Sequence, residues 1–249
     1  MTRSRLDIAL VTRGLCPSRE QAQRAIMAGR VTVNGQPARK PSESVTEGDE
    51  VGLAAPERFV SRGGHKLEHA LVHFRVDVAG RIAVDLGAST GGFTDCLLQH
   101  GAERVYAVDV GQGQLAWKLR QDPRVVVMER TNARQLSPDR MPAGFAPADL
   151  VTVDCSFISL RLLLPPAAGL VRPGGRIIAL VKPQFEAGKA EVDRGAGVIT
   201  DPLIHERVLA ELAAFVREQP ALRWSGVVES PLLGPAGNKE FLVLLEKIG

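Results

Sequence analysis

Short apolar runs, each followed by glycine or polar residues, recur between residues 81 and 182. Their length and their content of valine, isoleucine and leucine are typical of buried strands, and longer mixed segments separate them. Such alternation of strands and helices favours a parallel, doubly wound α/β sheet with helices on both faces. The expected strands are Ile82–Leu86, Val105–Val110, Val125–Met128, Leu150–Asp154 and Ile177–Lys182.

The last fifty residues have a different pattern. A helical segment from about Pro202 to Glu218 precedes an apolar stretch at Val227–Pro231, a Gly/Pro-rich loop at 234–238 and a strand at 240–245. Two strands joined in this way predict a hairpin, with an antiparallel strand at the edge of the sheet. Glu240 opens the last strand, where its side chain can point into a site.

The N-terminal residues predict a separate, small α+β module. Leu6, Ala9 and Leu10 have helical spacing, and Ser18 can cap a second helix, Arg19 to Ala28. The alternation at Val31–Val33 into Asn34-Gly35 is a strong hairpin signal, and Val45–Leu53, turning at Gly48-Asp49, supplies another strand. We therefore expect domains at 1–55 and 63–249, joined by a linker at 56–62 in which Pro56 discourages a continuous helix.

Charge separates the two parts of the chain. Residues 1–40 hold eight Lys/Arg against two Asp/Glu, a balance of +6, so the remaining residues sum to −3 of the total +3. A basic module on a nearly neutral body predicts a polyanionic partner such as RNA, although a solvated charged face is the alternative for any single arginine. The candidate RNA-binding residues are Arg5, Arg13, Arg19, Arg24, Arg30, Lys40 and Arg62.

Composition excludes several other classes. No apolar run approaches the roughly 18–20 residues of a membrane span, and the basic N-terminus lacks the apolar stretch of a signal peptide. The three cysteines are scattered, which favours neither a disulfide framework nor a C-x-x-C metal site. We therefore expect a cytoplasmic protein with reduced thiols. No stable protein partner is predicted.

A glycine-rich loop directly follows the first expected strand of the larger domain. It fits D-x-G-x-x-x-G-G, because Asp85, Gly87, Gly91 and Gly92 have that spacing around Ala88, Ser89 and Thr90. The G-x-G-x-x-G dinucleotide pattern fails at its third position, and no Gly-Lys-Ser/Thr follows as in a P-loop. The pattern that remains is typical of enzymes that use S-adenosyl-L-methionine. A sheet of this type that ends in a hairpin is the methyltransferase variation of the Rossmann-like fold.

Polar residues end the other strands of the same sheet. Asp109 has the spacing of a carboxylate that holds ribose hydroxyls, and Asn132 is a candidate for the adenine ring. Asp154 and Lys182 end the fourth and fifth strands, so all four residues should converge at one edge. A simple turn-forming role for Asp85 and Asp109, and a structural Asp154–Lys182 ion pair, are the alternatives.

The first fifty residues resemble the S-four-type RNA-binding domain, which docks on structured RNA. The resemblance rests on Arg5-Leu6-Asp7, Gly14-Leu15, Ser18-Arg19, Ala22, Ile26, Gly29, Val31, Val33-Asn34-Gly35, Lys40-Pro41 and Gly48-Asp49.

The whole chain resembles the TlyA-type (hemolysin A) ribosomal RNA 2′-O-methyltransferases, which join that module to an FtsJ-like catalytic domain. The carriers are the stretches 61–67, 85–94, 108–111, 154–160, 181–186 and 237–241. The resemblance implies methyl transfer from S-adenosyl-L-methionine to cytidine ribose in ribosomal RNA of one or both subunits. It also implies a catalytic tetrad of Lys66, Asp154, Lys182 and Glu240.

Roles for the tetrad follow from the reaction. A ribose 2′-oxygen attacks a methyl group on sulfur, so the protein must position the hydroxyl and remove its proton. Lys182 is our hypothesis for the general base, with Lys66 stabilising charge on oxygen and Asp154 and Glu240 orienting the lysines and the ribose. The sequence does not decide between the two lysines.

Three other functions compete with this interpretation. Membrane lysis, suggested by the hemolysin name, needs a spanning or amphipathic segment, and a non-catalytic ribosome assembly factor needs neither the tetrad nor the glycine loop. A pseudouridine synthase needs a Gly-Arg-Leu-Asp signature in its catalytic domain, whereas the Arg-Leu-Asp here is at Arg5–Asp7. His65, His69 and His73 line one helical face, but no further ligand favours a metal site. Trp117 and Phe93 are expected in the core.

Overall fold

The computed structural model describes residues 3–55 and 57–249, and the chain divides between Arg58 and Phe59 into two compact units. Each unit has its own apolar core, one around Leu6, Leu10 and Ile26 and the others within 59–249. The division falls inside the expected linker; its first residue, Pro56, and the first two residues of the expected RNA-binding domain, Met1 and Thr2, lie outside the described residues. Phe59 is buried in the larger unit, against Gly64.

The smaller unit contains two helices and five short strands within its described residues. Ser18 caps α2, since its Oγ accepts a hydrogen bond from the Gln21 amide at 3.3 Å. The predicted hairpin is present: β2 and β3 pair antiparallel, and Asn34 and Gly35 both have positive φ. The elements are β1 (Arg3–Arg5), α1 (Leu6–Thr12), α2 (Arg19–Met27), β2 (Val31–Val33), β3 (Gln36–Pro37), β4 (Ser44–Thr46) and β5 (Val51–Leu53).

One prediction for this unit was wrong. Val45–Leu53 forms two strands in different sheets, because β4 pairs with β1 while β5 pairs with β2. The turn between them is fixed by Asp49, whose carboxylate accepts hydrogen bonds from the Thr46 amide at 2.6 Å and the Thr46 hydroxyl at 2.9 Å. This turn redirects the chain, which the alternation pattern does not reveal.

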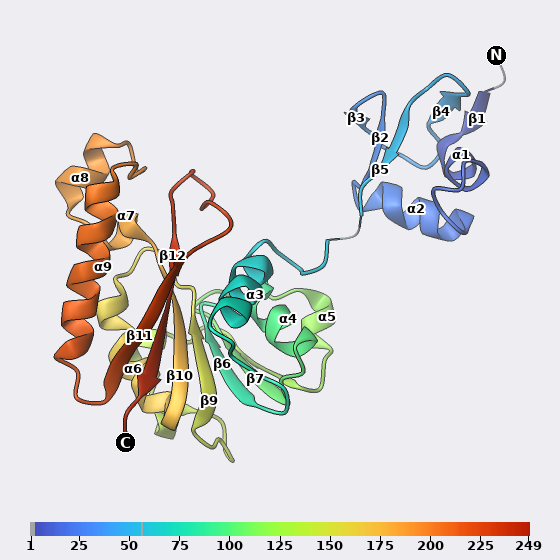
Figure 1. The fold of residues 1–249 in the computed structure, drawn as a ribbon. Coiled ribbons are helices and arrows are strands. Elements are labelled where there is room, and N and C mark those ends of the chain that lie inside the picture. The colour runs from blue at the N-terminus through green and yellow to red at the C-terminus, as the bar shows by residue number, and fades with distance from the viewer. Residues whose placement is uncertain (1–2, 56) are drawn as a thin grey trace. The chain divides into compact units, whose positions relative to one another are not determined.

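The larger unit is built on a seven-stranded sheet, all of it within the described residues, in the order β11-β12-β10-β9-β6-β7-β8 (Figure 1). β10, β9, β6, β7 and β8 are parallel. The strands are β6 (Ile82–Leu86), β7 (Arg104–Val108), β8 (Val125–Met128), β9 (Ala148–Val153), β10 (Val171–Val181), β11 (Leu222–Glu229) and β12 (Phe241–Lys247).

The predicted C-terminal hairpin, β11–β12, is present and forms the antiparallel edge of the sheet. β12 pairs antiparallel with both β10 and β11, which leaves β11 outermost. This insertion brings the start of β12, beside Glu240, next to the end of β10, beside Lys182, because Phe241 pairs with Val181.

Helices cover both faces of this sheet, as its strands require. Alternate residues of β10 point to opposite faces: Ile177, Ala179 and Val181 pack with α6 and α9, while Ile178 and Leu180 pack with α3 and α4. The longer helices are α3 (Gly63–His73), α4 (Gly92–Gln99), α6 (Leu164–Leu170) and α9 (Pro202–Arg217); the shorter ones are α5 (Trp117–Arg120), α7 (Pro183–Glu186) and α8 (Lys189–Arg194). Short 3₁₀ turns lie at 133–135, 138–140 and 160–162.

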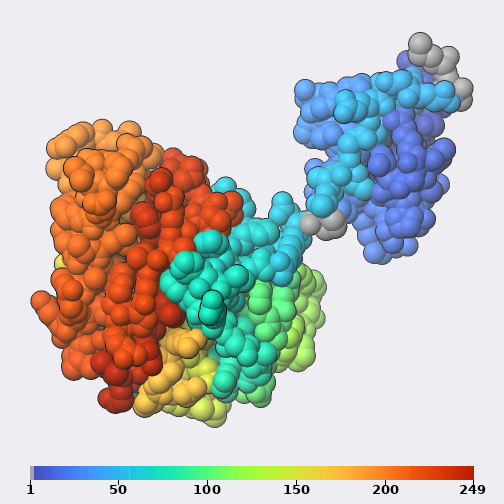
Figure 2. All heavy atoms as spheres, in the orientation of Figure 1, coloured from blue at the N-terminus to red at the C-terminus, as the bar shows by residue number. Residues whose placement is uncertain are grey.

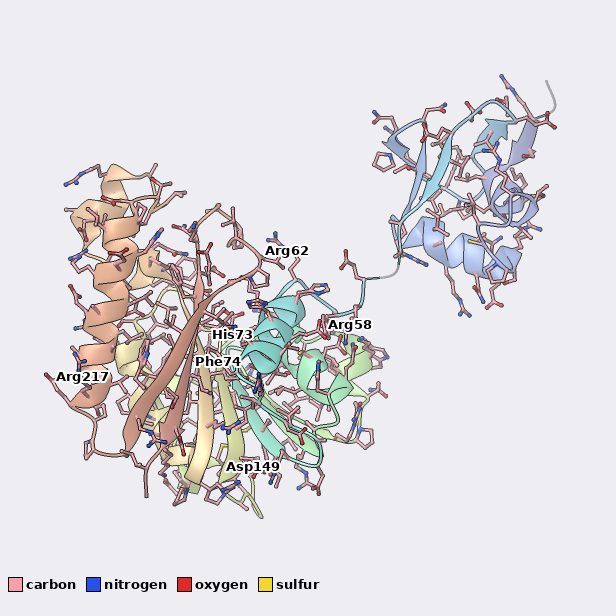
Figure 3. All side chains as sticks on the ribbon, in the orientation of Figure 1. Arg58, Arg62, His73, Phe74, Asp149 and Arg217 are labelled. Carbon is pink, nitrogen blue, oxygen red and sulfur yellow. The ribbon has the colours of Figure 1, made fainter. Side chains whose placement is uncertain are left out.

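The two ends of the sheet are easily told apart. Asp149, at the start of β9, lies at the opposite end of the sheet from Arg62 (Figure 3). On the surface of the larger unit, α3 lies beside the C-terminal strand segment (Figure 2), and α3 contacts β12.

Phe93 is buried as expected, but Trp117 is 73% exposed, because the single-turn helix α5 buries Leu119 instead.

Candidate active site

Two adjoining cavities lie at the carboxyl ends of the parallel strands. The larger, about 440 Å³, is lined by Asp109, Asn132 and Cys155 among others. The smaller, about 270 Å³, is lined by Lys66, Lys182 and Glu240 among others. Four residues line both cavities: Gly87, Ser89, Asp154 and Ser156. The predicted convergence at one edge of the sheet is therefore seen, and it divides into two compartments that meet at Asp154.

Backbone geometry explains the glycines of the loop. Gly87 has φ +86°, and a Cβ atom there would lie 2.8 Å from the carbonyl oxygen of Asp154. At Gly92 a Cβ atom would lie 2.3 Å from Ser61 Oγ, so only glycine allows α4 to start so close to the N-terminus of α3. The glycine loop therefore packs closely against Asp154 at one end and against the start of α3 at the other.

Asp109 and Asn132 both line the larger cavity. The carboxylate of Asp109 accepts hydrogen bonds from the backbone amides of Ser89, at 2.8 Å, and Gly111, at 2.7 Å. Asn132 Oδ1 accepts from the Arg134 amide at 3.0 Å. These contacts fix the orientation of both side chains toward the same compartment.

Asp85 lies beneath the loop. It is 1% exposed, and its carboxylate accepts hydrogen bonds from the hydroxyls of Thr94, at 2.7 Å, and Thr152, at 2.9 Å. Burial raises its pKa to about 6, against the opposing effect of the two hydroxyls. Neither Asp85 nor Gly91 is among the residues that line the two cavities, whereas Ala88, Thr90 and Gly92 line the smaller one.

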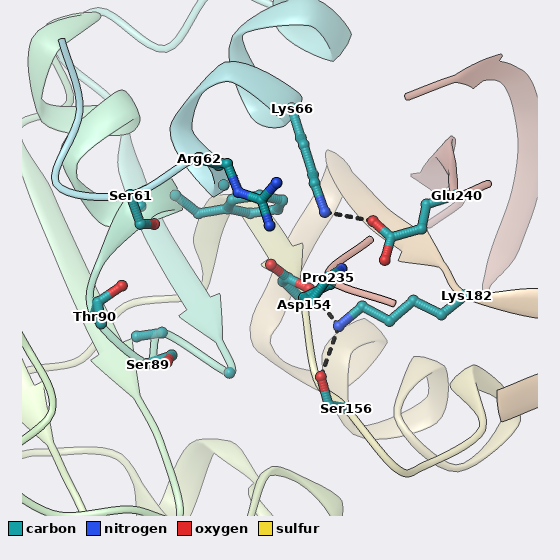
Figure 4. Close-up of a pocket in the computed structure, with 15 residues that line it drawn as sticks. Ser61, Arg62, Lys66, Ser89, Thr90, Asp154, Ser156, Lys182, Pro235 and Glu240 are labelled. Carbon is teal, nitrogen blue, oxygen red and sulfur yellow. Dashed lines mark hydrogen bonds and ion pairs between the residues drawn. The ribbon is translucent and has the colours of Figure 1, made fainter. Parts of the chain in front are cut away.

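The four tetrad side chains meet in the smaller cavity as two ion pairs (Figure 4). Lys66, from α3, pairs with Glu240, which is 1% exposed. Lys182 Nζ lies 2.7 Å from Asp154 Oδ1 and also donates to Ser156 Oγ, at 2.9 Å, and to the Cys155 carbonyl, at 3.1 Å. The Asp154–Lys182 ion pair that was considered as a structural alternative is present. Both of its side chains line the smaller cavity, so the pair is accessible from that cavity.

Glu240 is positioned by the loop before β12. A Cβ atom at Gly234 would lie 2.5 Å from Glu240 Oε1, so the loop can pass the carboxylate only with glycine there. Asn238, 1% exposed, accepts a hydrogen bond from the Ile199 amide at 2.8 Å and donates to the Gly197 carbonyl at 2.9 Å. The loop that carries Glu240 is thus attached to the segment that follows α8.

Glu186 connects the loops that follow β9 and β10. Its carboxylate accepts hydrogen bonds from Ser159 Oγ, at 2.6 Å, and from the Leu160 amide, at 2.7 Å. Burial raises the pKa of this carboxyl. Because Glu186 follows Lys182 by four residues and Ser159 follows Asp154 by five, these bonds hold the two sides of the ion pair together.

Several residues that line the cavities have no role predicted from the sequence. Ser61, Ser156 and Pro235 line the smaller cavity, and Phe157 lines the larger one. Phe157 is 89% exposed, has φ +62° and contacts the ring of Phe185 at 5.1 Å. The sequence signal for a role of Phe157 is its position three residues after Asp154, the polar residue that follows β9. Arg62, predicted to bind RNA, lines the smaller cavity beside Lys66.

The other candidate RNA-binding residues all lie in the smaller unit. Arg5 and Arg19 both contact the buried carboxylate of Asp7, at 3.0 and 2.9 Å, and the hydrogen bonds from Arg5 hold the pKa of Asp7 well below its usual range. Arg24 pairs with Glu20 at 2.5 Å. The remaining three make no carboxylate contact within the described residues: Arg13, Arg30 and Lys40.

The described residues contain neither a metal-binding cluster nor a membrane-spanning helix. Within 3–55 and 57–249, no three or more His, Cys, Asp or Glu side chains are grouped so that they could hold a metal ion. In the same ranges, no helix has the length and apolar character needed to cross a bilayer.

Comparison with known proteins gives matches over nearly the whole chain. Residues 59–247 match the FtsJ-like methyltransferase family, and residues 4–51 match the S4 domain. The 16S/23S rRNA (cytidine-2′-O)-methyltransferase TlyA of Mycobacterium tuberculosis is 48% identical over 247 residues, covering 98% of this chain and 90% of that protein. Hemolysin A of Brachyspira hyodysenteriae is 38% identical, covering 96% and 98%.

A solved structure agrees with these sequence matches. A Streptococcus thermophilus protein described as a hemolysin has a TM-score of 0.74 and 46% identity, and the match covers 100% of this chain and 90% of that one.

Proposed function

The chain belongs to the FtsJ-like methyltransferase family, and we propose that it transfers a methyl group from S-adenosyl-L-methionine to the ribose 2′-hydroxyl of cytidine in ribosomal RNA. The observation that carries the proposal is the meeting of Lys66, Asp154, Lys182 and Glu240 in one cavity that adjoins the glycine loop. The relative from Mycobacterium tuberculosis, named for this reaction, supports the substrate.

We assign the larger cavity to the cofactor. Asp109 would hold the ribose hydroxyls, Asn132 the adenine, and the loop at Gly87–Ser89 would lie against the amino-acid part. When bound, S-adenosyl-L-methionine supplies a methyl group that is activated by its attachment to a positively charged sulfur. Asp154 and Gly87, which line both cavities, are suited to the boundary at which that methyl meets the substrate.

We assign the smaller cavity to the ribose that is modified. Lys182 takes the role of general base, and Asp154 holds its amino group. Lys66, fixed by Glu240, stabilises the developing negative charge on the 2′-oxygen. Arg62 is a further cation in this cavity and forms no ion pair among the described residues, so it suits an RNA phosphate next to the target ribose.

The smaller unit would supply RNA affinity through its basic residues. The target nucleotide must leave its stack to place its 2′-hydroxyl in a cavity of about 270 Å³. The exposed ring of Phe157, beside the cavities, is suited to stack on such a base. A ribosomal substrate also implies that the protein acts in the cytoplasm.

The test is transfer of labelled methyl to separate unmethylated small subunits, large subunits and free ribosomal RNA. We expect an alkali-resistant dinucleotide on mass spectrometry, because a 2′-O-methyl group blocks hydrolysis of the next phosphodiester bond. Asp154→Ala should give no product. Label on a base, or none on any of the three RNAs while cofactor binds, would contradict the proposal.

A further inference from the structure

We propose that Ser156 is a catalytic residue whose hydroxyl carries the proton from the ribose 2′-hydroxyl to Lys182. The inference rests on the proposed function and deepens it, since it names a route for the proton within the same site.

A run of three consecutive residues surrounds that amino group. Asp154 Oδ1 lies at 2.7 Å, Ser156 Oγ at 2.9 Å and the Cys155 carbonyl at 3.1 Å. A lysine ammonium has three hydrogens, so these three acceptors take one each. The substrate hydroxyl therefore has no open path to the nitrogen unless it displaces one of them.

The three acceptors differ in what they do when Lys182 is neutral. A carboxylate and a carbonyl can only accept hydrogen bonds, whereas a serine hydroxyl can also donate one. Only Ser156 can therefore reverse its hydrogen bond and donate to the nitrogen lone pair. The same contact serves both protonation states of the lysine, which a proton route requires.

Ser156 is also the most accessible of the three groups. It is exposed and lines both cavities, so its hydroxyl lies where the ribose and the methyl donor are proposed to meet. Lys182 itself is 8% exposed. A 2′-hydroxyl in the smaller cavity can donate to Ser156 Oγ while Ser156 donates to Lys182.

The proposed step balances in atoms and charge. As the 2′-oxygen bonds to the methyl carbon, the carbon–sulfur bond breaks and its electron pair stays on sulfur as a neutral thioether. The 2′-hydroxyl proton moves to Ser156 Oγ, and the proton of Ser156 moves to Nζ of neutral Lys182. Ser156 is regenerated, and Lys182 becomes an ammonium that releases its proton to water before the next turnover.

The backbone of the loop that follows β9 positions Ser156, and the packing of the Ser156 side chain is not needed for this. Phe157 has φ +62°, and Glu186 accepts hydrogen bonds from Ser159 and from the Leu160 amide. Because Ser156 is exposed, its replacement by alanine removes the hydroxyl and leaves the packed core untouched. A change of rate can therefore be assigned to the missing hydroxyl.

The experiment compares Ser156→Ala, Ser156→Thr and Ser225→Ala in the full chain. Ser225 is an exposed serine of β11 that lines neither cavity, so it serves as the control. We expect Ser156→Ala to lower kcat about 100-fold, the lower end of the range for general acid–base catalysis, with cofactor affinity changed less than about twofold. Ser156→Thr should keep at least about a third of kcat, and Ser225→Ala should stay near wild type.

Rates in mixtures of H₂O and D₂O give an independent readout. Wild type should show a curved dependence on deuterium fraction, because two protons move in one step, and Ser156→Ala a linear one. If Ser156→Ala keeps more than about half of kcat, Lys182 takes the proton directly and the proposal is wrong. Equal loss in the alanine and threonine variants would also overturn it. Absence of ribose methylation by wild type would instead overturn the proposed function.

Discussion

Gly87 and Gly113 both have positive φ, +86° and +72°, but their surroundings differ. A Cβ atom at Gly87 would lie 2.8 Å from the Asp154 carbonyl oxygen, whereas at Gly113 nothing lies within 4 Å. We expect Gly113→Ala to cost about 1 kcal/mol of unfolding free energy, from backbone strain alone. Gly87→Ala should cost about 2–4 kcal/mol and also displace Asp154, so that methyl transfer falls. Urea unfolding and the methylation assay compare the two; equal effects would show that the contact with Asp154 is unimportant.

Asp85 makes the stability of the larger unit depend on pH. Its folded pKa, about 6, is above the value of about 3.9 in an unfolded chain, so the folded state favours the protonated carboxyl. The contribution is therefore fully present below pH 4, is lost as pH rises to 6, and is constant above that. Two units correspond to about 3 kcal/mol.

Asp85→Asn removes this titration. Relative to wild type, we expect the variant to gain about 2–3 kcal/mol of unfolding free energy between pH 4 and pH 8. Unfolding curves of both proteins at the two pH values give this difference, and other titrating groups cancel in it. A difference that does not change with pH would mean that Asp85 is ionised at low pH in the folded protein.

At the level of elements, the sequence predicted what depends on local patterns. The parallel strands β6 and β8 have the predicted bounds, because their apolar runs end at polar or glycine residues. The insertion of β12 between β10 and β11 depends on pairing between distant segments, which periodicity does not encode. The burial of Asp85 and the contact of Ser156 with Lys182 are likewise tertiary facts, although the strand ends that carry them were predictable.

Asn238 joins the segment that follows α8 to the loop that carries Glu240. Asn238→Ala leaves the Ile199 amide and the Gly197 carbonyl without their partners, which should cost about 2 kcal/mol or more. We expect trypsin to cut after Lys189 and Arg194 at least about tenfold faster and kcat to fall, because the same loop carries Glu240. Glu229→Gln, which breaks the exposed pair with Lys239, is the control. Unchanged cleavage would mean that other contacts hold the segment.

At the scale of the whole molecule, the charge of the N-terminal unit is partly used within the unit. Arg5, Arg19 and Arg24 are predicted from the sequence to bind RNA, and in the structure each lies against a carboxylate, of Asp7 or Glu20. The contact between Arg19 and Asp7 joins two helices, so composition alone could not reveal it. Arg13 and Arg30 donate to backbone carbonyls instead. Together with Lys40 they form no ion pair among the described residues, so we expect these three cations to contact phosphate.

The number of basic residues without carboxylate partners determines how much RNA binding should weaken when the N-terminal unit is removed. Residues 59–249 contain both cavities, and their apolar cores include no residue of the N-terminal unit. This part of the chain should therefore fold alone and bind the cofactor with an affinity within about twofold of that of the full chain. Affinity for ribosomal RNA should fall at least about tenfold. The slope of log affinity against log salt should decrease by about 3, since three of the six candidate RNA-binding residues in this unit, Arg13, Arg30 and Lys40, form no ion pair among the described residues. A decrease near 6 would mean that RNA displaces Asp7 and Glu20 from their arginines, and an unchanged slope would place the RNA contacts on the catalytic unit, around Arg62.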